Sequence, residues 1–373
     1  MKRLLVSAGL VAASVCVHAQ SSVLLFGVAD IGVGRTSGTG AGHVDGVLFG
    51  GNTATRLGFR ATEDLGGGLA ANVWMEGQLN MDTGTGSTGG GFDFLRRSTV
   101  SLLGRFGEVR LGRDYLPSYL NMVNFDAWSR VGFGSIEITG PAAAGGGPSY
   151  VRNSNTVAYL LPSTLGGIYG HVQYAFGEQQ SDKSALGVGS TAAAVTTKRT
   201  GNFLGGRLGY ASGRLDVGGA YSRFYDATRS ANTPATFFAS DYQLANIGVS
   251  YDFGFVKPLL FVQQERIDGN GAVPAFVYNT VSLSARVPLG AGMFRAGVSH
   301  YDIKNSANDF NKVSLGYVYS LSKRTSLYAD LGRISNKGAS RVAIGGVGGS
   351  IASGAPLAGG NSTGIAFGIT HAF

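Results

Sequence analysis

One short stretch of the sequence, Ser299-His300-Tyr301-Asp302, contains the residue types of a hydrolytic site. A serine, a histidine and a carboxylate can act as nucleophile, general base and orienting acid. Successive side chains of a β-strand point to opposite faces, so Ser299 and His300 cannot pair with each other if this stretch is a strand. The stretch therefore gives little support to an enzyme.

Two other sets of residues match binding motifs only in part. Gly84-Thr85-Gly86-Ser87-Thr88-Gly89 has the Gly-x-Gly-x-x-Gly spacing, but it follows no buried parallel strand and opens no helix, so a dinucleotide site is not expected. The histidines outside the N-terminal segment lack the close spacing of zinc ligands; they are His43, His171, His300 and His371. We expect neither a metal nor a cofactor.

Arginines on one face of a strand are the strongest functional signal. In the stretch 56–60, Leu57 and Phe59 make an apolar face, so Arg56, Gly58 and Arg60 point the other way. If the apolar face meets lipid, both arginines lie on one wall of a lumen. Charges lining a water-filled pore select ions by sign. The expected chemistry is therefore ion selection without catalysis.

Charge and composition exclude several classes of protein. The formal charge of the 373-residue chain is +8, but no run of five Lys or Arg occurs, which argues against a nucleic-acid partner. The 61 glycines have no Gly-X-Y period, and the 21 Phe and 16 Tyr are too many for a disordered chain. Glycine combined with aromatic residues is typical of β-barrels.

The N-terminus has the features of a secretory signal peptide. Lys2 and Arg3 precede an apolar run over 4–17, and Val17-His18-Ala19 fits a cleavage site. We expect residues 1–19 to be removed and 20–373 to form one domain, with a net charge of +6. The single cysteine, Cys16, lies in the removed part, so disulfides and thiolate metal sites are excluded.

Alternating polarity predicts about sixteen strands, and no apolar stretch is long enough for a membrane-spanning helix. The predicted strands are 22–34, 53–63, 68–80, 94–104, 107–114, 151–161, 168–178, 202–211, 214–225, 242–253, 256–267, 277–288, 292–303, 311–320, 325–335 and 363–373.

Short and long connections alternate between these strands, as in outer-membrane barrels with short periplasmic turns and long outer loops. The long connections are 81–93, 115–150, 179–201, 226–241 and 336–361. A soluble sandwich also has short strands with regular turns, and periodicity alone does not exclude it.

The end of the chain favours the barrel. The stretch from Gly364 to Phe373 places Ile365, Phe367 and Ile369 on one face with Phe373. A C-terminal Phe after alternating apolar residues resembles the assembly signal of outer-membrane barrels. Together with the strand that follows the signal peptide, it resembles the Gram-negative general porins, particularly the β-proteobacterial branch. The stretches 55–60, 107–113 and 151–159 also resemble porin strands, in the same order.

The resemblance implies an all-β transmembrane antiparallel barrel of about sixteen strands, usually a homotrimer, whose third outer loop, here 115–150, folds into the lumen. It also implies a basic constriction formed by Arg56, Arg96 and Arg152, which Arg60 and Arg110 extend by their inward parity. In the loop, Asp126 and Glu137 are the candidate carboxylates that oppose these arginines, with Asp114 at its entrance. Interfacial anchoring is the alternative role for each arginine.

We therefore expect an outer-membrane porin for passive diffusion of small hydrophilic solutes and ions, with a weak preference for anions. The alternatives are a substrate-specific outer-membrane channel and an outer-membrane barrel enzyme. Expected partners are outer-membrane lipid, lipopolysaccharide and the barrel assembly machinery. Aromatic residues at strand ends are candidates for interfacial girdles; they are Tyr159, Tyr169, Tyr210, Tyr221, Phe224, Phe253 and Tyr328.

Overall fold

The structure is a computed structural model of the whole chain. It describes residues 22–87, 90–136, 150–178, 184–185, 194–195, 199–231, 236–269, 274–345 and 351–373. The expected signal peptide, 1–19, and one expected constriction residue, Glu137, lie outside the described residues.

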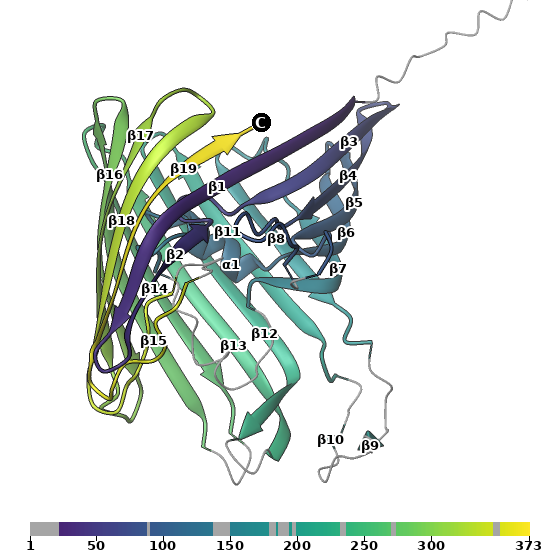
Figure 1. Cartoon of the computed structure of the whole chain (residues 1–373). Coiled ribbons are helices and arrows are strands. Elements are labelled where there is room, and N and C mark those ends of the chain that lie inside the picture. The colour runs from purple at the N-terminus through teal and green to yellow at the C-terminus, as the bar shows by residue number, and fades with distance from the viewer. Residues whose placement is uncertain are drawn as a thin grey trace, which may run out of the picture.

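Antiparallel strands form a closed barrel (Figure 1). The main sheet of the described chain has 17 strands, and β2 (Gly42–Phe49) pairs only with β1, so sixteen strands make the ring. These sixteen are β1 (Ser22–Gly38), β3 (Arg56–Gly66), β4 (Leu69–Gly77), β5 (Arg97–Gly104), β6 (Gly107–Tyr115), β7 (Arg152–Leu160), β8 (Ile168–Ala175), β11 (Phe203–Ser212), β12 (Leu215–Ala231), β13 (Thr236–Tyr251), β14 (Lys257–Ile267), β15 (Phe276–Leu289), β16 (Gly292–Ile303), β17 (Phe310–Ser320), β18 (Thr325–Asn336) and β19 (Asn361–Ala372).

The two ends of the described chain close the ring. Residues Val28–Gly38 of β1 pair with Ser362–Ala372 of β19, while Ser22–Val28 pair with β3. Beyond the last paired residue, Phe373 and Gly27 exchange two backbone hydrogen bonds of 3.0 Å each. Each of the sixteen ring strands is paired with a neighbouring strand on both sides. The ring therefore has no edge strand, as a hydrocarbon environment requires.

The predicted number of strands is confirmed, but the first hairpin was missed. β1 runs to Gly38 rather than to residue 34, and β2 returns beside it after a turn at Gly40 and Gly42, which both have a φ of 74°. Glycine adopts this conformation at the lowest cost because it has no Cβ. A short pair, β9 (Ser184–Ala185) with β10 (Ala194–Val195), was also not predicted.

The polarity of the strands is that of a membrane barrel. Along β15, Val281 and Leu283 are 46% and 52% exposed, whereas Ser282 and Ser284 beside them are 1% and 3% exposed. A soluble sandwich would bury the apolar set instead. The outward apolar face suits lipid, and the inward polar face suits water. Alternation alone did not separate these two folds, but the exposure of each face does.

One segment of the chain lies inside the ring. This segment, Leu116–Ile136, is called the inner loop below, and it begins with the helix α1 (Pro117–Asn124), which is visible within the barrel in Figure 1. The proline occupies the first turn, where its missing N–H group leaves no helical bond unmade. Apolar side chains of the loop pack on β11 to β14 in one buried cluster, which includes Leu116, Met122, Phe125, Phe203, Phe224, Tyr242 and Phe261.

The aromatic residues at strand ends divide into two groups. Tyr159, Tyr210, Tyr221 and Phe253 are exposed on the outside of the wall. Phe224 and Tyr328 are each 4% exposed and face the interior, and the hydroxyl of Tyr169 donates to Asp216 inside the barrel. The girdle prediction was wrong for these three residues, because their positions in the two-residue period are inward.

Among the described residues, no helix is both long enough and apolar enough to cross a membrane.

Candidate functional site

A cavity of about 560 Å³ lies between the inner loop and the barrel wall. Four arginines line it: Arg56, Arg96, Arg286 and Arg295. None of its described lining residues is an aspartate or a glutamate. We call it the arginine-lined cavity. Its remaining lining residues are Asn52, Thr53, Ala54, Tyr115, Tyr119, Leu120, Val123, Ala127, Trp128, Ser129, Val131, Met293 and Val318.

Two of the arginines predicted from the sequence reach the cavity from the wall that contains β3 and β5. Arg56 is the first residue of β3, and no ion pair among the described residues includes it. Arg96 was expected within a strand, but it precedes β5, which begins at Arg97. The backbone N–H of Arg96 donates to the carbonyl of Glu76 at 3.1 Å, so the residue is held beside β4 although it precedes β5.

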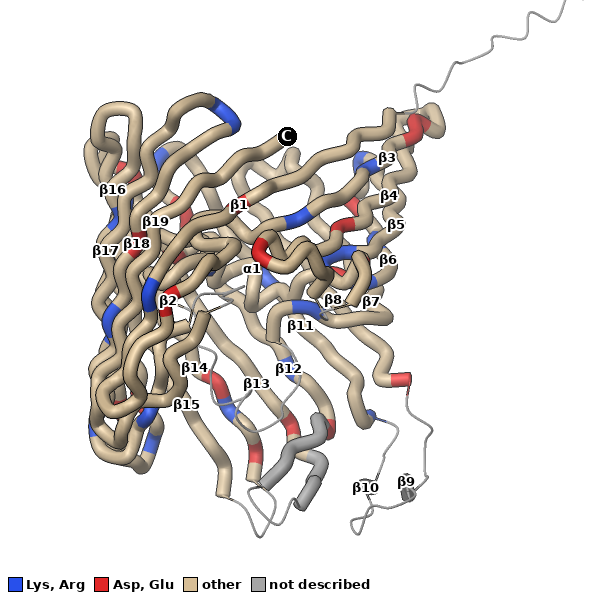
Figure 2. The backbone as a smooth tube through the Cα atoms, in the orientation of Figure 1, with Lys and Arg blue, Asp and Glu red and all other residues tan. Residues whose placement is uncertain are grey.

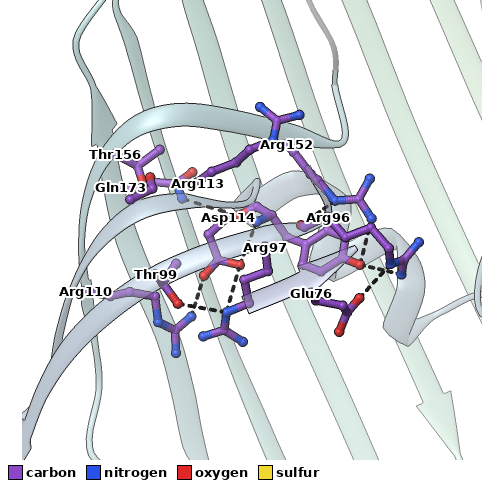
Figure 3. Close-up of polar contacts among 12 residues, drawn as sticks. Glu76, Arg96, Arg97, Thr99, Arg110, Arg113, Asp114, Arg152, Thr156 and Gln173 are labelled. Atoms are coloured by element: carbon purple, nitrogen blue, oxygen red, sulfur yellow. Dashed lines mark hydrogen bonds and ion pairs between the residues drawn. The ribbon is translucent and has the colours of Figure 1, made fainter. Parts of the chain in front are cut away.

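Arg96 belongs to a bonded group that also contains Arg152 (Figure 3). The Nε of Arg96 contacts Oε1 of Glu76 at 2.6 Å, and its Nη2 donates to the hydroxyl of Tyr115 at 3.0 Å. The Nη2 of Arg152 donates to the same hydroxyl at 2.8 Å, and its Nε donates to the carbonyl of Arg96 at 2.7 Å. Arg152 therefore supports Arg96 without lining the cavity itself.

A second group of charges on β5 and β6 is largely neutralised within itself. Arg110 binds Asp114 at 2.6 Å, and Arg97 lies 3.7 Å from Asp114 (Figure 3). Arg110 also binds Glu108 at 2.7 Å. Figure 2 likewise shows basic and acidic segments close together in the region of β3 to β7. The inward direction expected for Arg110 is observed, but its charge is balanced and it does not line the cavity.

Arg60 has the expected parity but lies away from the cavity. Its guanidinium carbon is 5.2 Å from the centre of the Trp74 ring, and Arg97 lies over the same ring at 4.2 Å. Arg60 is not one of the cavity's lining residues.

The opposite wall contributes two arginines that sequence reasoning missed. Arg286 on β15 donates to the carbonyls of Asp126 and Ala127 at 2.8 and 3.0 Å, and thus binds the inner loop to the wall. Arg295 on β16 donates to Oδ1 of Asn52 at 3.1 Å. The sequence pattern could have indicated Arg286, because it has the same parity as the inward serines of β15.

Asp126 was expected to face the arginines, and its carboxylate does not. It is fully buried and accepts the backbone N–H groups of Trp128, Arg130 and Ile136 at 3.1, 2.8 and 3.3 Å. Burial raises the pKa of Asp126, and the three N–H groups oppose that rise. The carboxylate of Asp126 therefore faces the backbone of the inner loop and stabilises the turn of that loop.

Two carboxylates of the barrel wall hold the loops that border the cavity. Asp330 on β18 accepts Nε1 of Trp128 at 2.6 Å and the N–H of Gly134 at 3.0 Å. Asp30 on β1 accepts the N–H groups of Gly51 and Thr53, both at 2.9 Å. Lys312 also donates to the carbonyl of Ser135. Asp330 and Asp30 are both buried, and their charged hydrogen bonds to the loops hold the loops in position.

The possible hydrolytic residues are separated. Ser299 Oγ donates to Ser282 inside the wall at 2.9 Å, while His300 is exposed on the outside and contacts Asn311 at 2.7 Å. Within the described ranges, no group of three or more His, Cys, Asp or Glu side chains is arranged to hold a metal ion.

Comparisons with known proteins agree with this architecture. A family described as Gram-negative porin matches residues 6–339. Outer membrane porin protein 32 of Delftia acidovorans is 36% identical over the full length of both chains. An outer membrane porin protein of Bordetella pertussis is 29% identical over 88% of this chain and 93% of its own length.

Among solved structures, an anion-selective porin from Comamonas acidovorans has a TM-score of 0.81 and 34% identity. The match covers 95% of this chain and all of that one. The closed barrel, its outward apolar face and these relatives lead to one conclusion. The chain belongs to the β-proteobacterial branch of the Gram-negative porin family, and it is a channel-forming barrel of the outer membrane.

Proposed function

We propose that the channel prefers anions and that the arginine-lined cavity is its constriction. The observation that carries the proposal is the lining: four arginines from two walls and no carboxylate among the described lining residues. Lining charge in a narrow, low-dielectric path attracts counter-ions and repels co-ions. In this proposal Arg56 and Arg96 attract anions at the constriction itself, and Arg152 holds Arg96 in place. Arg60 and Arg110 lie in the lumen outside the constriction.

The reversal potential in a salt gradient across a planar bilayer tests this proposal. We expect the sign that corresponds to anion permeation, and a preference that weakens as the salt concentration rises, because ions screen the lining charge. A reversal potential of the opposite sign would contradict the proposal.

Replacing Glu76 with glutamine gives a second, graded test. The change keeps the side chain's shape and removes the negative charge that lies 2.6 Å from Arg96. We expect a modest increase in anion preference with little change in conductance. The measurement is the reversal potential of the variant and the wild type in the same gradient. A decrease in anion preference would show that Glu76 acts mainly by positioning Arg96.

The proposal also separates the channel from its two alternatives. For an enzyme, Ser299 and His300 are separated by the barrel wall, so we propose passive diffusion without catalytic turnover. For a substrate-specific channel, conductance would be blocked strongly by one solute and weakly by its close analogues. A panel of solutes added during the bilayer recording distinguishes these cases.

We further propose a homotrimer in contact with outer-membrane lipid and lipopolysaccharide. We place the contact between protomers at an aromatic cluster: Phe94 packs edge-on against Phe59 at 5.8 Å and Phe92 at 5.2 Å, and Phe92 is 43% exposed. Phe373 is proposed as the signal for the barrel assembly machinery, and its exposed ring at the end of the closing strand is consistent with that role. Conductance steps in groups of three would support the trimer.

A further inference from the structure

The arginine-lined cavity has walls of two different kinds. The barrel contributes the four arginines, whereas the inner loop contributes Leu120, Val123 and Ala127. One side of Leu120 and of Val123 packs against the apolar cluster beneath the loop, and the rest of each side chain is not buried. Charged groups and an apolar surface therefore face the same space.

We propose that the cavity is a binding subsite for organic monoanions with an apolar body, such as aromatic carboxylates. The inference rests on the proposed function and specifies which anions the constriction favours. The carboxylate of such a solute pairs with the arginines, and its ring lies against Leu120 and Val123. An inorganic anion or acetate uses the arginines but gains little from the loop.

The dimensions of the cavity suit this class of solute. Its volume of about 560 Å³ falls within the range of roughly 300–1,000 Å³ typical of small-molecule pockets. Met293 and Val318 extend the apolar lining on the barrel side. The solute can thus remain paired with an arginine while its hydrocarbon part stays out of water.

The arginines are available to an incoming anion to different degrees. Arg56 and Arg295 are in none of the ion pairs of the described chain, and Arg286 is bonded to backbone carbonyls of the loop. A carbonyl does not neutralise a guanidinium, so the site keeps a positive field. The described lining has no carboxylate that would repel the solute.

The test uses the purified full-length porin in planar bilayers, with the chloride current as the readout and sodium benzoate or sodium acetate as the added solute. We expect benzoate to halve the chloride current at a concentration about fivefold lower than acetate, because its ring removes apolar surface from water. Equal concentrations for the two salts would overturn the inference. An anion-selective channel with that result would leave the proposed function intact, whereas a cation-selective channel would refute both.

A pair of variants locates the effect. Leu120→Gln makes the loop wall polar at one position, and we expect it to remove most of the difference between benzoate and acetate. Leu120→Met keeps the wall apolar and should keep the difference between benzoate and acetate. Persistence of the full difference in a conducting Leu120→Gln channel would contradict this assignment. If that variant does not fold, the comparison of the two salts on the wild type still decides the inference.

Discussion

Replacing Asp330 with alanine is expected to raise the single-channel conductance and to add fluctuations between current levels. The carboxylate accepts Nε1 of Trp128 and the N–H of Gly134, and both donors belong to the inner loop. Leaving a buried donor without a partner costs about 1–3 kcal/mol. The loop end that contains Trp128 and Gly134 should therefore leave the wall part of the time, which widens the passage. Single-channel recording measures both effects.

Asp330→Asn is the control that separates positioning from charge. Asparagine is neutral like alanine, but its carbonyl still accepts one of the two hydrogen bonds. If Asp330 positions the loop, Asp330→Asn should give an intermediate conductance and fewer fluctuations than Asp330→Ala. If its charge alone matters, both variants should show the same increase in anion preference with a quiet current, and that result would contradict the positioning role.

Reversing the charge of two cavity arginines is expected to change the sign of selectivity. In the double variant Arg56→Glu/Arg286→Glu, each wall of the cavity exchanges a positive for a negative group. The local field should then favour cations, and the reversal potential should cross zero at low salt. Arg286 also binds the loop carbonyls of Asp126 and Ala127, so the conductance should rise as well.

The matched control places the same change of charge outside the lumen. Arg266 on β14 and Arg333 on β18 are both exposed on the outer side of their strands. Arg266→Glu/Arg333→Glu therefore alters the net charge equally without touching the cavity. Its reversal potential should match that of the wild type. An equal shift in both double variants would indicate that net charge, rather than the cavity, sets selectivity.

Much of the barrel could be predicted because a two-residue period is a local signal. The inward direction of Arg56 followed from Leu57 and Phe59 alone, and the outward face of the last strand followed from Ile365, Phe367 and Ile369, which are 38%, 54% and 41% exposed. The hairpin of β1 and β2 was missed because its glycine turn resembles the glycine-rich connections elsewhere in the chain.

The site was harder to predict because its contacts are distant in the sequence. Trp128 and Asp330 are 202 residues apart, and Asn52 and Arg295 are 243 apart. Alternation indicates which way a side chain points but not how far the inner loop reaches across the lumen. For the same reason, Asp126 could not be recognised as a residue that bonds its own loop. Arg286 and Arg295 could have been found, since both share the parity of inward neighbours on predicted strands.

The junction of β1 and β19 has a consequence for the order of folding. Asp30 near the start of the described chain accepts the hydroxyls of Thr370 and Tyr328 at 2.6 and 3.0 Å, and Thr370 is 340 residues away. Until the last strand arrives, this carboxylate lacks both partners, and the backbone edges of β1 and β18 are open. Such distant pairing is slow, and hydrocarbon does not tolerate open edges. Because the ring closes only when the final strand pairs with both neighbours, a chain that lacks this strand cannot form the ring.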